Sequence, residues 1–125
     1  MKKITLALAT ATALSTLFLP LASHADERIP VLSTQELVKE CKFPASPESR
    51  SFCIGYTTAI YDTYLATRHP QRAKPFICVK QPGPTRDEVI GEFVKFAESA
   101  PQLGTQPASG TVLGFLAMRF PCAKK

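Results

Sequence analysis

The sequence has 125 residues, of which 45% are hydrophobic and 20% are charged, and its formal net charge is +5. A chain of this length folds as one domain, with room for one hydrophobic core but too little for an elaborate active-site cleft as well. Its basic residues are dispersed and form no continuous basic helix face, which argues against nucleic acid as a partner.

The first 25 residues have the pattern of a secretory signal peptide. A basic start precedes a mostly apolar stretch over residues 4–21, and Ser23 and Ala25 are the small residues expected before a signal peptidase cut. We therefore expect cleavage after Ala25, which leaves residues 26–125 as a single exported domain. An uncleaved membrane anchor is the alternative. Threonines and serines dilute the apolar stretch, and no second long apolar run follows, so no membrane contact is expected after cleavage.

The first two helices are expected over residues 34–42 and 49–66. Ser33 and Glu36 have the spacing of a capping box, which marks a helix start. Gly55 is costly inside a helix, so we interpret it as a place where another helix approaches closely. In the second segment, apolar residues recur every three or four positions, the period of an amphipathic helix: Phe52, Cys53, Tyr56, Ala59, Ile60 and Tyr64.

Residues 67–84 form a long, proline-rich connection. An apolar run over residues 76–79 can hold it against the core. Loops of this length are uncommon in compact domains and are often functional. A structural strap is slightly favoured over a binding role, and both interpretations stay open. The start of the connection is basic: Arg68, His69, Arg72 and Lys74.

A third helix is expected after this connection. Thr85 and Glu88 repeat the capping-box spacing and precede an amphipathic segment that ends at Pro101. The following loop, residues 99–106, consists mostly of small residues. We expect it to expose Leu103 at its tip.

The fourth helix begins near Pro107 and is apolar almost all round, which predicts either a central helix or part of a subunit interface. Gly110 and Gly114 indicate close packing between soluble helices. No alternating strand pattern of useful length appears. The expected fold class is therefore all-α, a small bundle of about four helices with long loops.

The four cysteines all lie beyond the signal segment. An even number of cysteines in a small exported domain predicts two disulfides. Of the three possible pairings, Cys41–Cys53 and Cys78–Cys122 are favoured, because each joins the end of one expected element to the start or end of another. A zinc site is disfavoured because no C-x-x-C pair occurs, and no metal or cofactor is expected.

No catalytic constellation stands out. His69 precedes a proline in a loop, and no serine lies in a nucleophile-elbow pattern. Asp62 lies on the polar side of the second helix, where a surface ion pair is favoured over a role in orienting a reactant. The residues alone therefore predict an exported, disulfide-stabilised helical binding module without catalytic residues.

Several motifs resemble those of the Tai family of periplasmic immunity proteins. Cys53-Ile54-Gly55-Tyr56 with Asp62 is similar to the family motif C-x-G-Y-x-x-G-x-x-D, and the chain closes on Phe120-Pro121-Cys122. The resemblance covers about residues 33–122. Three positions depart from the family pattern: Ala59 replaces the second motif glycine, Lys80 stands where a proline is usual, and Ile77 separates Phe76 from Cys78.

The resemblance implies a specific activity. Tai proteins neutralise peptidoglycan amidase effectors delivered by type VI secretion, are often homodimeric, and occlude the active site with a protruding loop. It thus implies a periplasmic, non-enzymatic inhibitor whose partner is a cognate amidase. Our first candidate for partner binding is Pro101, Gln102, Leu103, Gly104 and Thr105. The second is the basic connection with Arg68, His69 and Arg72. A periplasmic helical chaperone is the alternative function, and an enzyme that depends on His69 is disfavoured.

Overall fold

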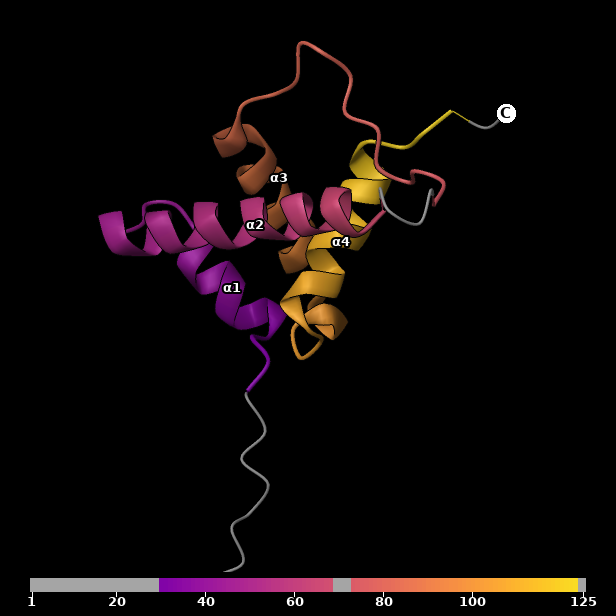
Figure 1. Cartoon of the computed structure of the whole chain (residues 1–125). Coiled ribbons are helices and arrows are strands. Elements are labelled where there is room, and N and C mark those ends of the chain that lie inside the picture. Colours follow the sequence, from indigo (N-terminus) through magenta and orange to yellow (C-terminus); the bar gives the residue numbers. More distant parts are fainter. Residues whose placement is uncertain (1–29, 69–72, 124–125) are drawn as a thin grey trace, which may run out of the picture.

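The computed structural model describes residues 30–68 and 73–123, so the expected signal peptide, His69 and Arg72 lie outside the described residues. It has four α-helices: α1 (Thr34–Cys41), α2 (Pro47–Arg68), α3 (Arg86–Ser99) and α4 (Ala108–Arg119) (Figure 1). A short 3-10 helix, η1 (Pro101–Leu103), lies between α3 and α4. The described residues contain no β-strand, only one isolated bridge between Ser33 and Pro107. The all-α prediction is confirmed.

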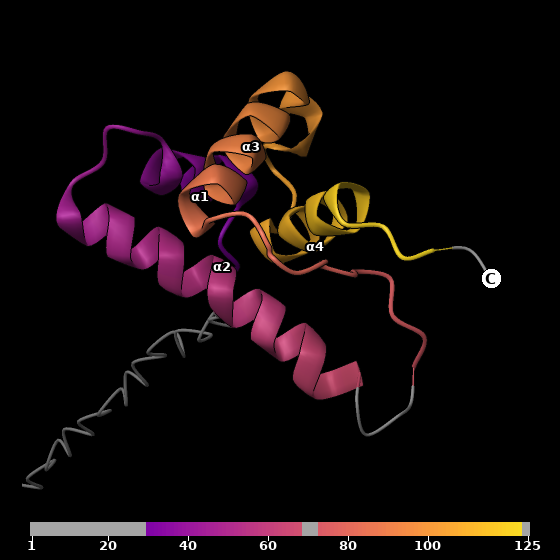
Figure 2. The same cartoon turned by 90° about the horizontal axis from the view of Figure 1, so that it is seen from above.

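The longest helix, α2, runs across the others. Figure 2 shows α1 and α3 side by side next to the first half of α2, with α4 beyond them. α1 is short but contacts each of the other three α-helices. None of the described helices is both long and apolar enough to cross a membrane.

The hydrophobic core lies where α1, α3 and α4 meet the inner face of α2. Leu37 of α1 and Phe93 of α3 are almost completely buried. Phe115 of α4 packs edge-on against Phe93 and at a tilt against Phe96, with ring centroids 5.7 and 5.5 Å apart. Such aromatic pairs contribute packing energy beyond the area they bury.

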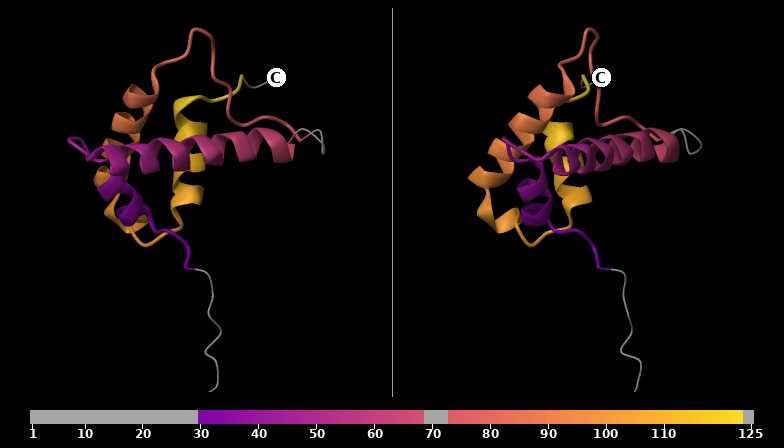
Figure 3. Two further views of the ribbon diagram at one scale, coloured as in Figure 1. Left: turned by 60° about the vertical axis from the view of Figure 1, so that its left-hand side comes forward. Right: turned by 90° about the vertical axis from the view of Figure 1, so that its left-hand side faces the viewer.

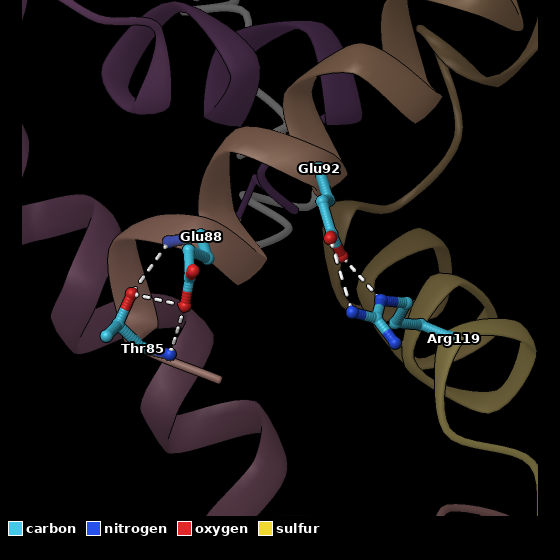
Figure 4. A network of polar contacts seen from close by, with 4 residues as sticks. All are labelled: Thr85, Glu88, Glu92 and Arg119. Atoms are coloured by element: carbon cyan, nitrogen blue, oxygen red, sulfur yellow. Dashed lines mark hydrogen bonds and ion pairs between the residues drawn. The ribbon is translucent and has the colours of Figure 1, made fainter. Parts of the chain in front are cut away.

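Both expected capping boxes are present. The Ser33 amide donates to the Glu36 carboxylate at 2.8 Å, and the Ser33 hydroxyl accepts from the Glu36 amide. At the start of α3, the Thr85 amide donates to the Glu88 carboxylate at 2.7 Å, and the Thr85 hydroxyl accepts from the Glu88 amide (Figure 4). These bonds satisfy amides that have no partner inside their own helix.

Backbone hydrogen bonds join the start of α1 to the segment that precedes α4, and the start of α4 to the segment that precedes α1. The amides of Thr34 and Gln35 donate to the carbonyls of Gln106 and Gly104, at 2.9 and 3.0 Å. In return, the amide of Ala108, the first residue of α4, donates to the Leu32 carbonyl at 2.9 Å. The segment between α3 and α4 is thereby held against the start of α1.

The two disulfides have the expected pairing. Cys41–Cys53 joins the last residue of α1 to α2, and Cys78–Cys122 joins the long connection to the segment after α4. Beside the second disulfide, the Cys78 amide donates a hydrogen bond to the Phe120 carbonyl at 2.8 Å. No free cysteine occurs among the described residues.

Within the described chain, three features of helix packing differ from those the sequence favoured. α4 is not the central helix, because only one of its faces is buried and Met118 is 61% exposed. Gly110 and Gly114 lie on the open side, and a Cβ added to either would meet nothing within 4 Å. The same is true of Gly55 in α2, where no helix approaches. The absence of a polar face on α4 therefore does not reflect burial within this chain.

Candidate functional site

The motif tyrosine, Tyr56, is a structural residue. It is half-buried on α2 and packs against the hydrophobic core. Burial raises the pKa of Tyr56, and the backbone of Ser109, in the first turn of α4, offsets part of the rise. Tyr56 therefore contributes to the packing of α2 against the core.

The other motif residues, Gly55 and Asp62, both lie at the surface of α2. No ion pair joins Asp62 to another residue in the part of the chain that the structure describes, so the surface pair expected for it is not seen there. Asp62 instead lines a cavity that is described below. The motif therefore combines one residue that packs against the core with two that are accessible to a partner.

The long connection is bound to α2 by a tyrosine. The hydroxyl of the buried Tyr64 accepts hydrogen bonds from the amides of Phe76 and Ile77, at 3.0 and 3.2 Å. The guanidinium of Arg68 lies over the Tyr64 ring, 5.4 Å from its centroid. Arg68 thus contributes to packing, while its two predicted companions in partner binding, His69 and Arg72, lie outside the described residues.

The first candidate binding segment, residues 101–105, is a turn bonded to α1. Leu103 is half-buried and not exposed at a tip, so that expectation is wrong. Gly104 faces the side chain of Gln35, and its carbonyl accepts the Gln35 amide. Pro101, Gln102 and Thr105 are exposed. A role of this turn in partner binding stays a prediction.

A different segment protrudes further. Residues 79–84, here called the arch, loop out beyond the helices before α3 (Figures 1 and 3). Residues 80–84 are all exposed. One end of the arch follows Cys78, which is fixed by its disulfide and by the bond to Phe120, and the other end meets the Thr85 cap. The only hydrogen bond seen within the arch joins the Gly83 amide to the Gln81 side chain, at 3.2 Å.

A cavity of about 480 Å³ lies beneath the arch, between α2, α3 and α4. The exposed Asp62 and Arg86 lie at its edge, and the half-buried Thr58 is part of its wall. The apolar residues of its wall come from the arch, α3, α4 and the residue after α4: Val79, Val89, Ile90, Phe93, Val112, Phe115, Leu116 and Phe120. Sequence reasoning missed this site, and the only signal for it was the unusual length of the connection.

Two ion pairs join neighbouring helices at the surface. Arg119 of α4 donates to Glu92 of α3 at 2.6 Å, as Figure 4 shows, and Arg50 of α2 contacts both carboxylate oxygens of Asp87. The hydrogen bond from Arg119 is the main cause of the lowered pKa of Glu92. These pairs are partly exposed, so each contributes little to the free energy of unfolding.

The arrangement of the described His, Cys, Asp and Glu side chains bears on a metal site. In the described parts of the chain, no three His, Cys, Asp or Glu side chains gather in a way that could hold a metal ion. Exposed features that a partner could contact include the arch, the cavity, the turn at residues 101–105 and the open face of α4.

Comparison with known families gives one match. Residues 33–122 match the family of Rap1a immunity proteins. No curated protein and no solved structure matches the sequence. The match confirms that this is an immunity protein, as the motifs implied, and it spans the region in which the resemblance was seen. From Ser33 to Cys122, the chain belongs to the Rap1a immunity protein family.

Proposed function

We propose that this immunity protein acts in the periplasm, where it binds a peptidoglycan amidase delivered by type VI secretion and occludes the active site. Membership of the Rap1a family supports one part of this proposal, namely that the chain is an immunity protein that binds a secreted effector. The amidase target and the location are our inference. The observation that carries it is the pair of disulfides in a chain of this family.

The disulfides favour an oxidising compartment. All four cysteines are paired within the domain, and such bonds persist in the bacterial periplasm but are rare in the cytosol. The first 25 residues supply the export signal in this proposal. A cell-wall hydrolase would act in that same compartment, so the inhibitor has to be there too.

The choice of an amidase depends on the resemblance to Tai proteins. Gly55, Tyr56 and Asp62 match the motif of proteins that neutralise peptidoglycan amidases, and the closing Phe120-Pro121-Cys122 matches as well. Family membership indicates an inhibitor rather than an enzyme. In this proposal the protein works by filling the cleft of the amidase, so that substrate cannot enter.

We further propose that the protein is a homodimer through the open face of α4. Gly110, Gly114 and Met118 recur every four residues and are all exposed, with the half-buried Leu113 and Ala117 beside them. A helix surface of this apolar character is typical of a subunit interface. The absence of a polar face on α4 then has a cause outside the single chain.

The test is inhibition of the exported hydrolase encoded beside this protein. Purified peptidoglycan sacculi are incubated with that hydrolase and increasing amounts of residues 26–125, and release of soluble fragments is measured. We expect cleavage to stop when the inhibitor reaches the concentration of the hydrolase. Undiminished cleavage at a large excess of inhibitor would contradict the proposal. Fractionation of cells, with detection of the protein in the periplasmic extract, tests the location.

A further inference from the structure

The arch and the cavity beneath it have features of a docking surface. We propose that this surface contacts the cognate effector, and that the effector inserts an apolar side chain into the cavity. This inference rests on the proposed function, because it takes the effector as the partner. It assigns the contact to a segment that differs from both candidates chosen from the sequence.

The cavity reaches down to the hydrophobic core. Phe93, Val112 and Phe120 line it and belong to the core, with exposed fractions of only 2%, 3% and 9%. A cavity of about 480 Å³ with this lining falls in the size range of binding sites and favours an apolar occupant.

The charges at the edge of the cavity favour a protein as the occupant. Asp62 and Arg86 are exposed there, and neither forms an ion pair with another described residue. A protein surface can present a charge opposite to each of them while one apolar side chain fills the centre. Strong contact sites between proteins have this arrangement, a desolvated anchor surrounded by polar contacts.

The arch is preorganised for such a contact. Cys78 and Thr85 fix its two ends, and between them residues 80–84 are exposed and free to touch a partner. Binding costs less when the contacting loop already holds its bound shape. The turn at residues 101–105 is less suited to contact a partner, because the carbonyls of Gly104 and Gln106 already accept hydrogen bonds from amides of α1.

A larger side chain in the wall of the cavity should occupy the space that this inference assigns to the effector. Thr58 of α2 is half-buried and lines the cavity, so Thr58→Phe places an aromatic ring where the effector side chain would lie. Thr63→Phe is the matched control, because Thr63 lies on the same helix, is exposed and is not part of the wall. The probe is the purified co-encoded hydrolase with its nucleophile replaced, and affinity is measured by calorimetry. We expect Thr58→Phe to weaken binding about tenfold or more and Thr63→Phe to leave it within about twofold.

A second variant keeps the inference testable if Thr58→Phe fails to fold. Lys80→Glu reverses an exposed charge on the arch, and Lys95→Glu makes the same change on α3, at an exposed lysine that does not line the cavity. We expect only Lys80→Glu to weaken binding. If neither Thr58→Phe nor Lys80→Glu changes the affinity, the inference is overturned. It is also overturned if light scattering shows a changed molar mass while the affinity stays the same, because the surface would then bind a second copy of the chain. A wild-type protein that fails to bind the hydrolase instead contradicts the proposed function.

Discussion

The hydroxyl oxygens of Thr34 and Thr111 lie 2.8 Å apart, in a buried hydrogen bond that joins α1 to α4 across 77 positions of the sequence. Thr34 also contacts the Gln106 carbonyl at 3.0 Å. We predict that Thr34→Val lowers the free energy of unfolding by about 1–3 kcal/mol, because the shape is kept while buried polar groups lose their partner. Urea unfolding followed by circular dichroism measures this change.

Thr63→Val is the control for that prediction. Thr63 is exposed on α2, and exposed substitutions of this kind usually change the free energy of unfolding by less than about 0.5 kcal/mol. Equal midpoints for the two valine variants would show that the Thr34–Thr111 bond does not hold α1 against α4.

Tyr64 gives a second prediction, which concerns the base of the arch. Tyr64→Phe keeps the ring packed against Phe76, whose centroid lies 4.6 Å away, but removes the acceptor of two backbone amides. We expect a loss of about 1–3 kcal/mol of stability and faster amide exchange at Ile77. Tyr61→Phe, on the same helix, is the control and should leave exchange at Ile77 unchanged.

The disulfides give a third prediction. The chain-entropy model assigns about 3 kcal/mol to Cys41–Cys53 and about 4 kcal/mol to Cys78–Cys122, which closes the longer loop, 44 residues against 12. Replacing both cysteines of a pair by serine should therefore cost more for the second pair. Reductant should likewise lower the wild-type unfolding midpoint. An unfolding curve that reductant does not shift would contradict a stabilising role of these disulfides.

The parts of the fold that were predicted correctly depend on local signals. Ser33 with Glu36, and Thr85 with Glu88, are three residues apart, so their capping boxes can be read directly from the sequence. The disulfide pairing followed from the order of the elements. The apolar period predicts the second helix over residues 49–66, and it runs from Pro47 to Arg68, a difference typical of helix ends.

The arch and its cavity could not be predicted in this way. The wall of the cavity combines Thr58 of α2, Val79 of the arch and Phe115 of α4, which come together only through tertiary packing. The same limit explains the error at Gly110 and Gly114. A small residue in a helix shows where a neighbour could approach, but it does not say whether the neighbour is in the same chain.

Acid should destabilise the domain, which is a fourth prediction. Hydrogen bonds with Ser33 and with Thr85 lower the pKa of Glu36 and Glu88, and the bond from Arg119 lowers that of Glu92. The unfolded chain therefore takes up more protons in acid than the folded chain. The stability from these groups is fully present above about pH 5 and is lost as the pH falls through the folded-state pKa values.

The variant Glu88→Gln distinguishes the effect of the Glu88 charge on acid stability from the effect of its hydrogen bonds with Thr85. The amide keeps an oxygen that can accept from Thr85, but it does not titrate. We expect the variant to be less stable than the wild type at pH 7 and to lose less stability between pH 7 and pH 3. Urea midpoints across this range measure the slope, and identical slopes for the two proteins would rule out a contribution from the α3 cap.

The open face of α4 gives the last prediction, which tests the proposed homodimer. Gly114 is exposed, and a side chain added there meets nothing within 4 Å of its Cβ in the single chain. Gly114→Glu is therefore compatible with the fold, but it places a carboxylate in the centre of an apolar interface. We expect the wild type to sediment as a dimer and Gly114→Glu as a monomer with unchanged circular dichroism. Gly91→Glu is the matched control, because Gly91 is an equally open, exposed glycine on α3, and it should leave the dimer intact. Since an unpaired buried charge costs several kcal/mol, a Gly114→Glu protein that remains dimeric would exclude this face of α4 as the interface.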